Sequence, residues 1–172
     1  VETSMITPDY LRMMARYNRW QNRNLYAAAG ALADAQRRAD RGAFFGSLHG
    51  TLSHLYWGDC IWMHRFSGSP KPSGTIADSP RFRPVWDDLV HDRDALDAAI
   101  LAWAEVVDPA WLAGETRWFS AAAGRELAQL NARLVVHFFN HQTHHRGQAH
   151  AILPGLGARP ADTDLILMPD IV

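Results

Sequence analysis

Residues 134–148 have the sequence LVVHFFNHQTHHRGQ and contain four of the nine histidines of this 172-residue chain. An α-helix turns by about 100° per residue, so five polar side chains share one stripe about 100° wide: His137, His141, His144, His145 and Gln148. The apolar residues Leu134, Phe138 and Ile152 follow the same spacing and direct this stripe toward a core. The segment therefore predicts a helix that carries a buried row of imidazoles.

Two histidines four residues apart on a helix can reach one metal ion from adjacent turns. The His-Glu-x-x-His form of this spacing is absent, because Gln142, Thr143 and His144 stand between His141 and His145. The general base of a metalloprotease is therefore missing. An isolated pair of this kind is more often hydrogen-bonded than metal-bound. Several buried imidazoles without partners would cost about 1–3 kcal/mol each, however, and one metal ion would satisfy several of them.

Composition argues against several classes of function. The formal net charge is −1, and the basic residues cluster only at Arg37, Arg38 and Arg41, so we expect no nucleic-acid partner. No apolar run approaches the roughly 20 residues of a membrane span, and Val1–Met5 lacks the basic and apolar regions of a secretory signal. The single cysteine, Cys60, allows no internal disulfide. These features predict a cytoplasmic protein without membrane contact.

Apolar residues at helical spacing predict four long helices, over residues of about 8–32, 43–66, 84–107 and 125–153. The stretch 69–84 is rich in Pro, Ser and Gly, and this connection between the second and third helices is long enough to run the length of a bundle. Residues 116–119 have some strand character, and residues 121–124 would turn them into either a short hairpin or a loop. We predict an all-α fold, with residues 1–172 as one four-helix-bundle domain onto which the tail from residue 158 packs back.

The second predicted helix offers a further candidate ligand. His54 has only small residues beside it on its own face: Ser47, Thr51 and Gly58. This leaves room for an ion and a substrate. His49 lies about 140° around the helix from His54, so both cannot face one site. Packing favours His54, although only modestly.

Other polar residues have less specific interpretations. Asn18 and Asn22 form either an exposed pair one turn apart or a pair that hydrogen-bonds the histidine-rich helix. Asp59 lies about 140° around its helix from the candidate ligand, and we interpret it as a structural residue that bonds a neighbouring helix. Arg146 points away from the histidine stripe, which predicts a partner in an acid or a helix end. Cys60 lacks a nearby activating charge and is interpreted as a buried apolar residue.

Three segments of the chain resemble the DinB-like superfamily, a group of damage-inducible, metal-binding four-helix proteins. They are Ala15–Trp20, Gly50–Leu55 followed by Asp59 and Trp62, and Asn140–Gln148. The Asn-His-x-x-x-His-Arg-Gly-Gln run of the third segment is the specific part, and the order and spacing match over nearly the whole chain. The resemblance implies that the metal ligands are His54, His141 and His145. It selects His145 over His144 and His54 over His49.

The resemblance also implies a homodimer and a divalent ion: zinc, nickel, iron or manganese. Three imidazoles without a carboxylate leave open positions on such an ion, which is typical of catalytic sites. In supporting roles, Gln148 would orient a bound water or substrate, and His137, one turn before His141, would hydrogen-bond to a group that itself contacts the metal ion. The sequence does not identify catalytic residues.

Similar proteins use bacterial thiols such as bacillithiol or mycothiol. We therefore expect a metal-dependent enzyme that activates a low-molecular-weight thiol or water, as a thiol S-transferase does when it adds the thiol to an electrophile. One alternative is a non-catalytic, stress-related metal-binding dimer, which the lack of an obvious general acid or base favours. A second alternative is a metal-dependent hydrolase.

Overall fold

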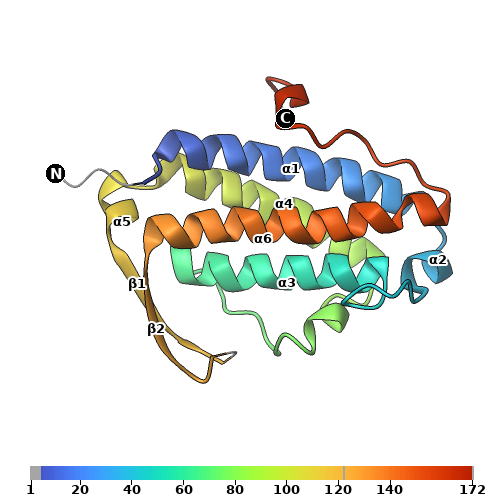
Figure 1. Cartoon of the computed structure of the whole chain (residues 1–172), viewed down its shortest axis with the longest axis horizontal. Coiled ribbons are helices and arrows are strands. Elements are labelled where there is room, and N and C mark those ends of the chain that lie inside the picture. The colour runs from blue at the N-terminus through green and yellow to red at the C-terminus, as the bar shows by residue number, and fades with distance from the viewer. Residues whose placement is uncertain (1–4, 122, 172) are drawn as a thin grey trace.

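The computed structural model describes residues 5–171 except residue 122. Predictions that involve residues 1–4, 122 and 172, among them the part of Val1–Met5 before Met5, fall outside the described residues. Four long helices lie side by side in Figure 1: α1 (Pro8–Gly30), α3 (Leu48–Ser67), α4 (Trp86–Val106) and α6 (Asn131–Ile152). The remaining elements are short: α2 (Asp34–Arg38), η1 (Ser79–Arg81), α5 (Pro109–Ala113), β1 (Glu115–Ser120), β2 (Arg125–Leu130), η2 (Pro154–Leu156) and η3 (Leu165–Leu167).

The long helices contact one another in a closed order. α1 packs against α4 and α6, and α3 packs against the same two helices, so that α6 lies between α1 and α3 in Figure 1. The chain is mostly helical with one small two-stranded sheet, which confirms the predicted predominance of helix. Within the described residues, none of the helices has both the length and the apolar character that crossing a membrane requires.

The start of α3 differs from the prediction. The helix was expected from about residue 43 but begins at Leu48. Gly42 and Gly46 have φ values of 67° and 76°, which are left-handed conformations that a continuing helix excludes. The hydroxyl of Ser47 then accepts a hydrogen bond from the Gly50 backbone N–H at 3.0 Å and caps the new helix. Residues 43–47 form a loop instead, and this loop lies against His54 through the ring of Phe45.

The predicted start of the last helix at about residue 125 is wrong. Residues 125–130 form β2, which pairs with β1 in an antiparallel hairpin that places Trp118 opposite Leu127. The hairpin extends away from the long helices near one end of the molecule (Figure 1). Its base is attached to α3, because the guanidinium of Arg65 lies 4.5 Å from the ring centre of Trp62 and 5.2 Å from that of Trp118.

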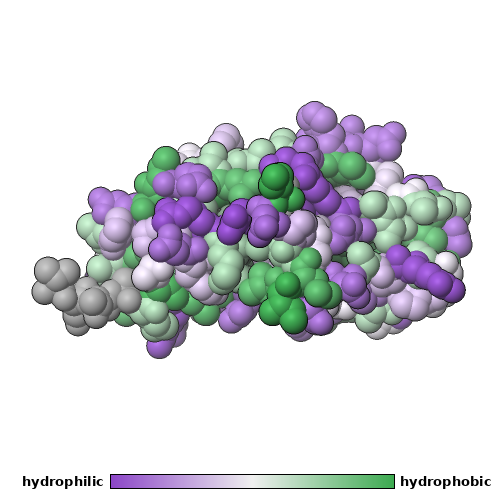
Figure 2. Space-filling view, turned by 90° about the horizontal axis from the view of Figure 1, so that it is seen from above, coloured by the Kyte–Doolittle hydropathy of each residue, from purple (hydrophilic) through white to green (hydrophobic). Residues whose placement is uncertain are grey.

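The C-terminal tail packs back on the helices only over part of its length. The side-chain amide of Gln21 on α1 donates to the carbonyl of Asp162 at 3.0 Å, which holds the tail against α1. Beyond this point Ile166 is 90% exposed. The face of the molecule seen in Figure 2 mixes hydrophilic and hydrophobic side chains, as most protein surfaces do.

Two apolar clusters occupy opposite ends of the helices. One contains Leu11, Met63, Ile100 and Phe138 with their neighbours. The other contains Leu25, Leu52, Leu89, Leu153 and theirs. On each long helix, the buried residues of the two clusters are separated by about two to three turns of chain. The space between the two clusters is filled by polar and charged side chains.

A buried polar layer lies between the two clusters and takes residues from all four long helices. Its members are Asn18 and Asn22 on α1, Asp59 on α3, Arg93 and Asp97 on α4, and Arg146 on α6. Arg93 donates to Asp59 and to Asp97, each at 2.7 Å. Asn18 donates to Asp97 at 2.8 Å, and Arg146 donates to the side-chain oxygen of Asn18. These hydrogen bonds connect the four helices at one level.

The polar layer decides between the sequence interpretations. Asn18 and Asn22 are buried rather than exposed, and Asn18 bonds the histidine-rich helix as the second interpretation required. Asp59 bonds a neighbouring helix, as expected. The expectation for Arg146 was wrong, because its close partner is the amide oxygen of Asn18 and neither an acid nor a helix end.

We predict that Arg93→Met lowers the free energy of unfolding by about 3–5 kcal/mol, because it leaves two buried carboxylates without their cation. Chemical denaturation followed by circular dichroism measures the effect. Arg23→Met is the matched control, since Arg23 of α1 also makes an ion pair to another helix, with Asp94 of α4, but at 3.8 Å and on the surface. Its cost should be only about 0–1 kcal/mol. Equal costs for the two variants would show that the polar layer does not hold the helices together.

Candidate metal centre

Three histidines from two helices meet at the interface between α3 and α6. His54 belongs to α3, and His141 and His145 are one turn apart on α6. Each offers a ring nitrogen, and these three nitrogens lie within 4.8 Å of one another. His54 and His145 are buried, whereas His141 is partly exposed. The arrangement brings together the three histidines that the sequence resemblance selected.

Hydrogen bonds orient two of the three rings. Nδ1 of His54 lies 2.8 Å from the hydroxyl of Ser79, and that hydroxyl donates its own proton to the carbonyl of Ile76 at 2.6 Å. The His54 nitrogen must therefore be the donor to Ser79, which leaves the lone pair on Nε2. In the same way, Nδ1 of His145 donates to the side-chain oxygen of Gln148 at 2.8 Å. Both rings thus present an unprotonated Nε2, the form that binds a metal ion.

The third ring, that of His141, depends on a missing side chain in α3. A β-carbon placed on Gly58 would lie 2.9 Å from Cε1 of His141, so the ring occupies space that only glycine leaves free. Nδ1 of His141 is buried and has no hydrogen-bond partner among the described residues. An unsatisfied buried nitrogen of this kind is unfavourable unless another group satisfies the ring.

The charge state of the three rings suits a cation. Burial, followed by the effect of His145, lowers the pKa of His54 to about 3. Burial and then the neighbouring histidines lower the pKa of His141 to about 3, and burial lowers that of His145. All three imidazoles are therefore neutral near pH 7, as metal ligands must be. Three nitrogen donors at this separation fit a divalent transition-metal ion.

The loop before α3 supplies an apolar wall. The ring of Phe45 stacks on the ring of His54 with centroids 3.7 Å apart and planes 19° apart, and it also lies 5.5 Å from the ring of His145. The adjacent Phe44 is 82% exposed. Phe45 therefore excludes water from one side of the histidine cluster, while its neighbour faces solvent.

Comparison with known protein families assigns the chain. The model of the DinB family matches residues 5–171, which is nearly the whole chain. The chain belongs to the DinB family. No curated protein and no solved structure matches it. The family match and the histidine cluster together support a metal-binding DinB protein.

Three further polar residues that the sequence analysis of this DinB protein considered lie outside the cluster of three histidines. Gln148 bonds His145 and lies 3.2 Å from His144 through its amide nitrogen, so it holds a ring in place and does not point freely toward a substrate. His137 lies 5.9 Å from His141 between ring centroids, but its ring packs edge-on against Trp62. His49 bonds the carbonyl of Arg83 at 2.7 Å, away from the cluster.

Sequence reasoning missed two residues of the site. Ser79 lies in the Pro-rich connection, where the sequence offers no signal that a hydroxyl would meet His54. Phe45 falls inside the predicted second helix of about residues 43–66, because the glycines on either side of residues 43–45 were not interpreted as a turn. Two glycines four residues apart, at 42 and 46, were the available signal for this loop.

We predict that Gly58→Ala lowers the affinity for divalent metal ions by about 10–100-fold, a typical loss when the support of a ligand is disturbed. The new methyl group overlaps the ring of His141 and displaces it. Isothermal titration calorimetry with zinc measures the effect. Gly147→Ala is the matched control, because a β-carbon there meets nothing within 4 Å. Unchanged zinc affinity in Gly58→Ala would show that the observed position of His141 is not needed for binding.

Proposed function

We propose that this DinB protein is a four-helix bundle that holds one divalent ion through His54, His141 and His145 and acts as a metal-dependent enzyme on a low-molecular-weight thiol or on water. The observation that supports it is the cluster of three neutral imidazole nitrogens within 4.8 Å, which contains no carboxylate. A divalent ion held by three protein ligands keeps open positions and lowers the pKa of a thiol or water bound to it.

The surroundings of the cluster favour a thiol over water. A thiol has a pKa of about 8.5, against 15.7 for water, so it needs far less assistance to lose its proton. Activating water also calls for a base that accepts its proton. The buried carboxylate of Asp59, five residues after His54 in the sequence, accepts a hydrogen bond from Arg93 and is therefore not free to act as this base. Thiol S-transfer is therefore the reaction that we place first, with hydrolysis second.

The thiol must come from outside the chain. Burial raises the pKa of Cys60 to about 11, and this residue is not part of the histidine cluster. Its thiol stays protonated at neutral pH and is a poor nucleophile. The residues of this chain have three roles in the proposal: the histidines bind, Ser79 and Gln148 orient two of the rings, and Phe45 excludes water. A homodimer and a cytoplasmic location stay predictions.

We predict that the wild-type protein contains about one divalent ion per chain and that His54→Ala, His141→Ala and His145→Ala each lose it, because two imidazoles no longer suffice as protein ligands. Plasma mass spectrometry on untagged protein measures the metal content. His144→Ala is the control, since this exposed residue is next to His145 but outside the cluster, and it should keep the metal. A wild-type protein that binds no metal after reconstitution would contradict the proposal.

We predict that the metal-loaded protein accelerates the conjugation of a small thiol to an electrophilic dye. Cysteine, coenzyme A, bacillithiol and mycothiol form a suitable panel. His141→Ala should abolish the acceleration, whereas Cys60→Ala should keep it because Cys60 is not the nucleophile. Equal rates for wild type and His141→Ala would exclude the enzymatic role. Metal binding with a large loss of thermal stability on chelation, but with no turnover, would instead support the non-catalytic metal-binding dimer.

A further inference from the structure

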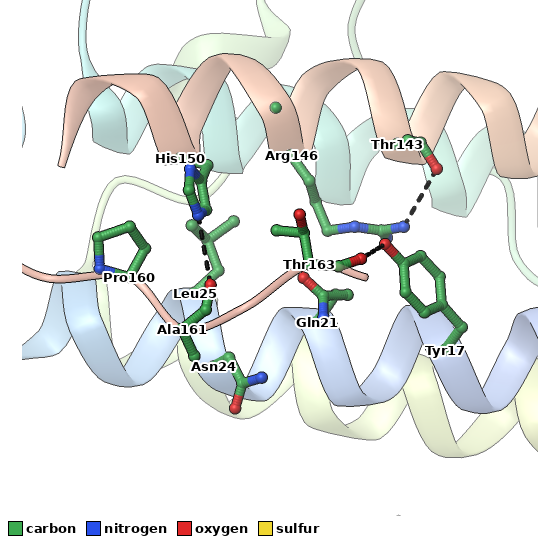
Figure 3. A pocket seen from close by; sticks show the side chains of 11 residues that line it. Tyr17, Gln21, Asn24, Leu25, Thr143, Arg146, His150, Pro160, Ala161 and Thr163 are labelled. Carbon is green, nitrogen blue, oxygen red and sulfur yellow. Dashed lines mark hydrogen bonds between the residues drawn. The ribbon is translucent and has the colours of Figure 1, made fainter. Parts of the chain in front are cut away.

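A cavity lies on the other side of α6 from the histidine cluster. It has a volume of about 180 Å³ and lies between α1, α6 and the tail segment 160–163, which we call the strap. Figure 3 shows the side chains that point into it from both helices, with the strap crossing between them. About 10–15 Å³ of such volume holds one water molecule, so the cavity has room for a small organic molecule.

The strap is held over the cavity by three side chains that bond three consecutive carbonyl groups. Tyr17 donates its hydroxyl proton to the carbonyl of Thr163 at 2.6 Å. Gln21 donates to the carbonyl of Asp162 at 3.0 Å, and Nε2 of His150 lies 3.3 Å from the carbonyl of Ala161. These are side-chain contacts to an otherwise irregular backbone, so the strap can separate from the cavity without unfolding a helix.

The cavity contains a buried cation that makes no hydrogen bond to an acidic group. Arg146 is 6% exposed, and its guanidinium extends into the space shown in Figure 3. The groups in direct contact with it are neutral: the amide oxygen of Asn18, the hydroxyl of Thr143 at 3.5 Å, and the ring of Tyr17 at 5.6 Å. Asp59 and Asp97 of the polar layer attract it without a hydrogen bond. No ion pair involves Arg146 within the described part of the chain, and Asp59 and Asp97 are bonded to Arg93. A guanidinium has five N–H donors, so several remain for a ligand.

The rest of the lining adds donors without adding an acid. Asn24 lines the cavity and makes no hydrogen bond to the described residues, so its amide group is available. The lining residues include no aspartate or glutamate. Buried guanidinium groups are ordinarily matched by a carboxylate or phosphate, and the planar guanidinium fits a planar carboxylate through two parallel hydrogen bonds.

We propose that this cavity is a binding site for a small carboxylic acid of two to four carbon atoms, whose carboxylate pairs with Arg146 and whose other end meets Asn24 under the strap. The site is separate from the histidine cluster and does not depend on a bound metal ion. The charge of Arg146 selects the ligand against the corresponding amides.

The test is isothermal titration calorimetry of the full chain with sodium malonate and sodium acetate at constant ionic strength, with malonamide and acetamide as uncharged probes. We expect saturable binding of a carboxylate and none of its amide. Arg146→Gln should weaken the binding by at least about ten-fold, the loss expected for a hydrogen-bonded charge. Arg133→Gln makes the same substitution at an exposed position of α6 and should leave the affinity unchanged.

Two more variants keep the test decisive. Arg146→Gln also removes the bond to Asn18, so Asn24→Leu, which fills the cavity from α1 and breaks no described hydrogen bond, must weaken malonate binding as well. His141→Ala must retain malonate binding, because a carboxylate that simply coordinated an ion at the histidine cluster would lose its site. No saturable binding by the wild type, unchanged binding in both Arg146→Gln and Asn24→Leu, or binding lost in His141→Ala would overturn the proposal.

Discussion

The two ion pairs of Arg93 are the interaction on which the arrangement of the helices depends. Arg93 lies on α4 and bonds Asp59 on α3 and Asp97 on its own helix, and the asparagines of α1 and Arg146 of α6 extend the same network. Burial raises the pKa of Asp59 to about 6 even with Arg93 beside it, whereas the pKa of Arg93 is raised by Asp97 and Asp59 in spite of its own burial. Such a pair contributes little net stability, and we interpret it as the element that fixes the register of the helices. The apolar clusters on either side would tolerate a shift of one helix against another, whereas directional hydrogen bonds between charged groups would not.

This register brings His54 opposite the two histidines of α6. Asp59 is five residues after His54 on α3, and Arg146 directly follows His145, so the helical positions that carry the ligands are next to those that are bonded in the polar layer. The connection between α3 and α4 then completes the site, since Ser79 in η1 orients the ring of His54. Buried, neutral and oriented imidazoles need little rearrangement to accept a cation, which is the usual advantage of preorganisation.

The sequence was informative where structure follows from local periodicity. The spacing of residues 137–148 alone placed the histidines on one stripe, and the small residues near His54 pointed to open space that the ring of His141 fills next to Gly58. It failed where distant segments decide the outcome. Residues 125–130 have no strong strand pattern, and only their pairing with residues 115–120 stops the helix from starting earlier. Asn18 and Asn22 fit a surface or a core equally well until the positions of Asp97 and Arg146 are known, and the role of Ser79 depends on the path of an irregular connection.

The four consecutive residues His145-Arg146-Gly147-Gln148 contact several different parts of the structure. On a helix, consecutive residues point about 100° apart, so this single turn serves different surroundings in succession. His145 faces α3, and Arg146 faces α1 and enters both the polar layer and the strap-covered cavity. Gln148 returns to the side of His145 and accepts its ring proton, an interaction that residues three apart can make. Gly147 has no neighbour that a β-carbon would meet, so its lack of a side chain is not explained by packing within the described chain. Because His145 and Arg146 are adjacent on one turn of α6, the same short segment supplies a candidate ligand to one side of the helix and a member of the polar layer to the other.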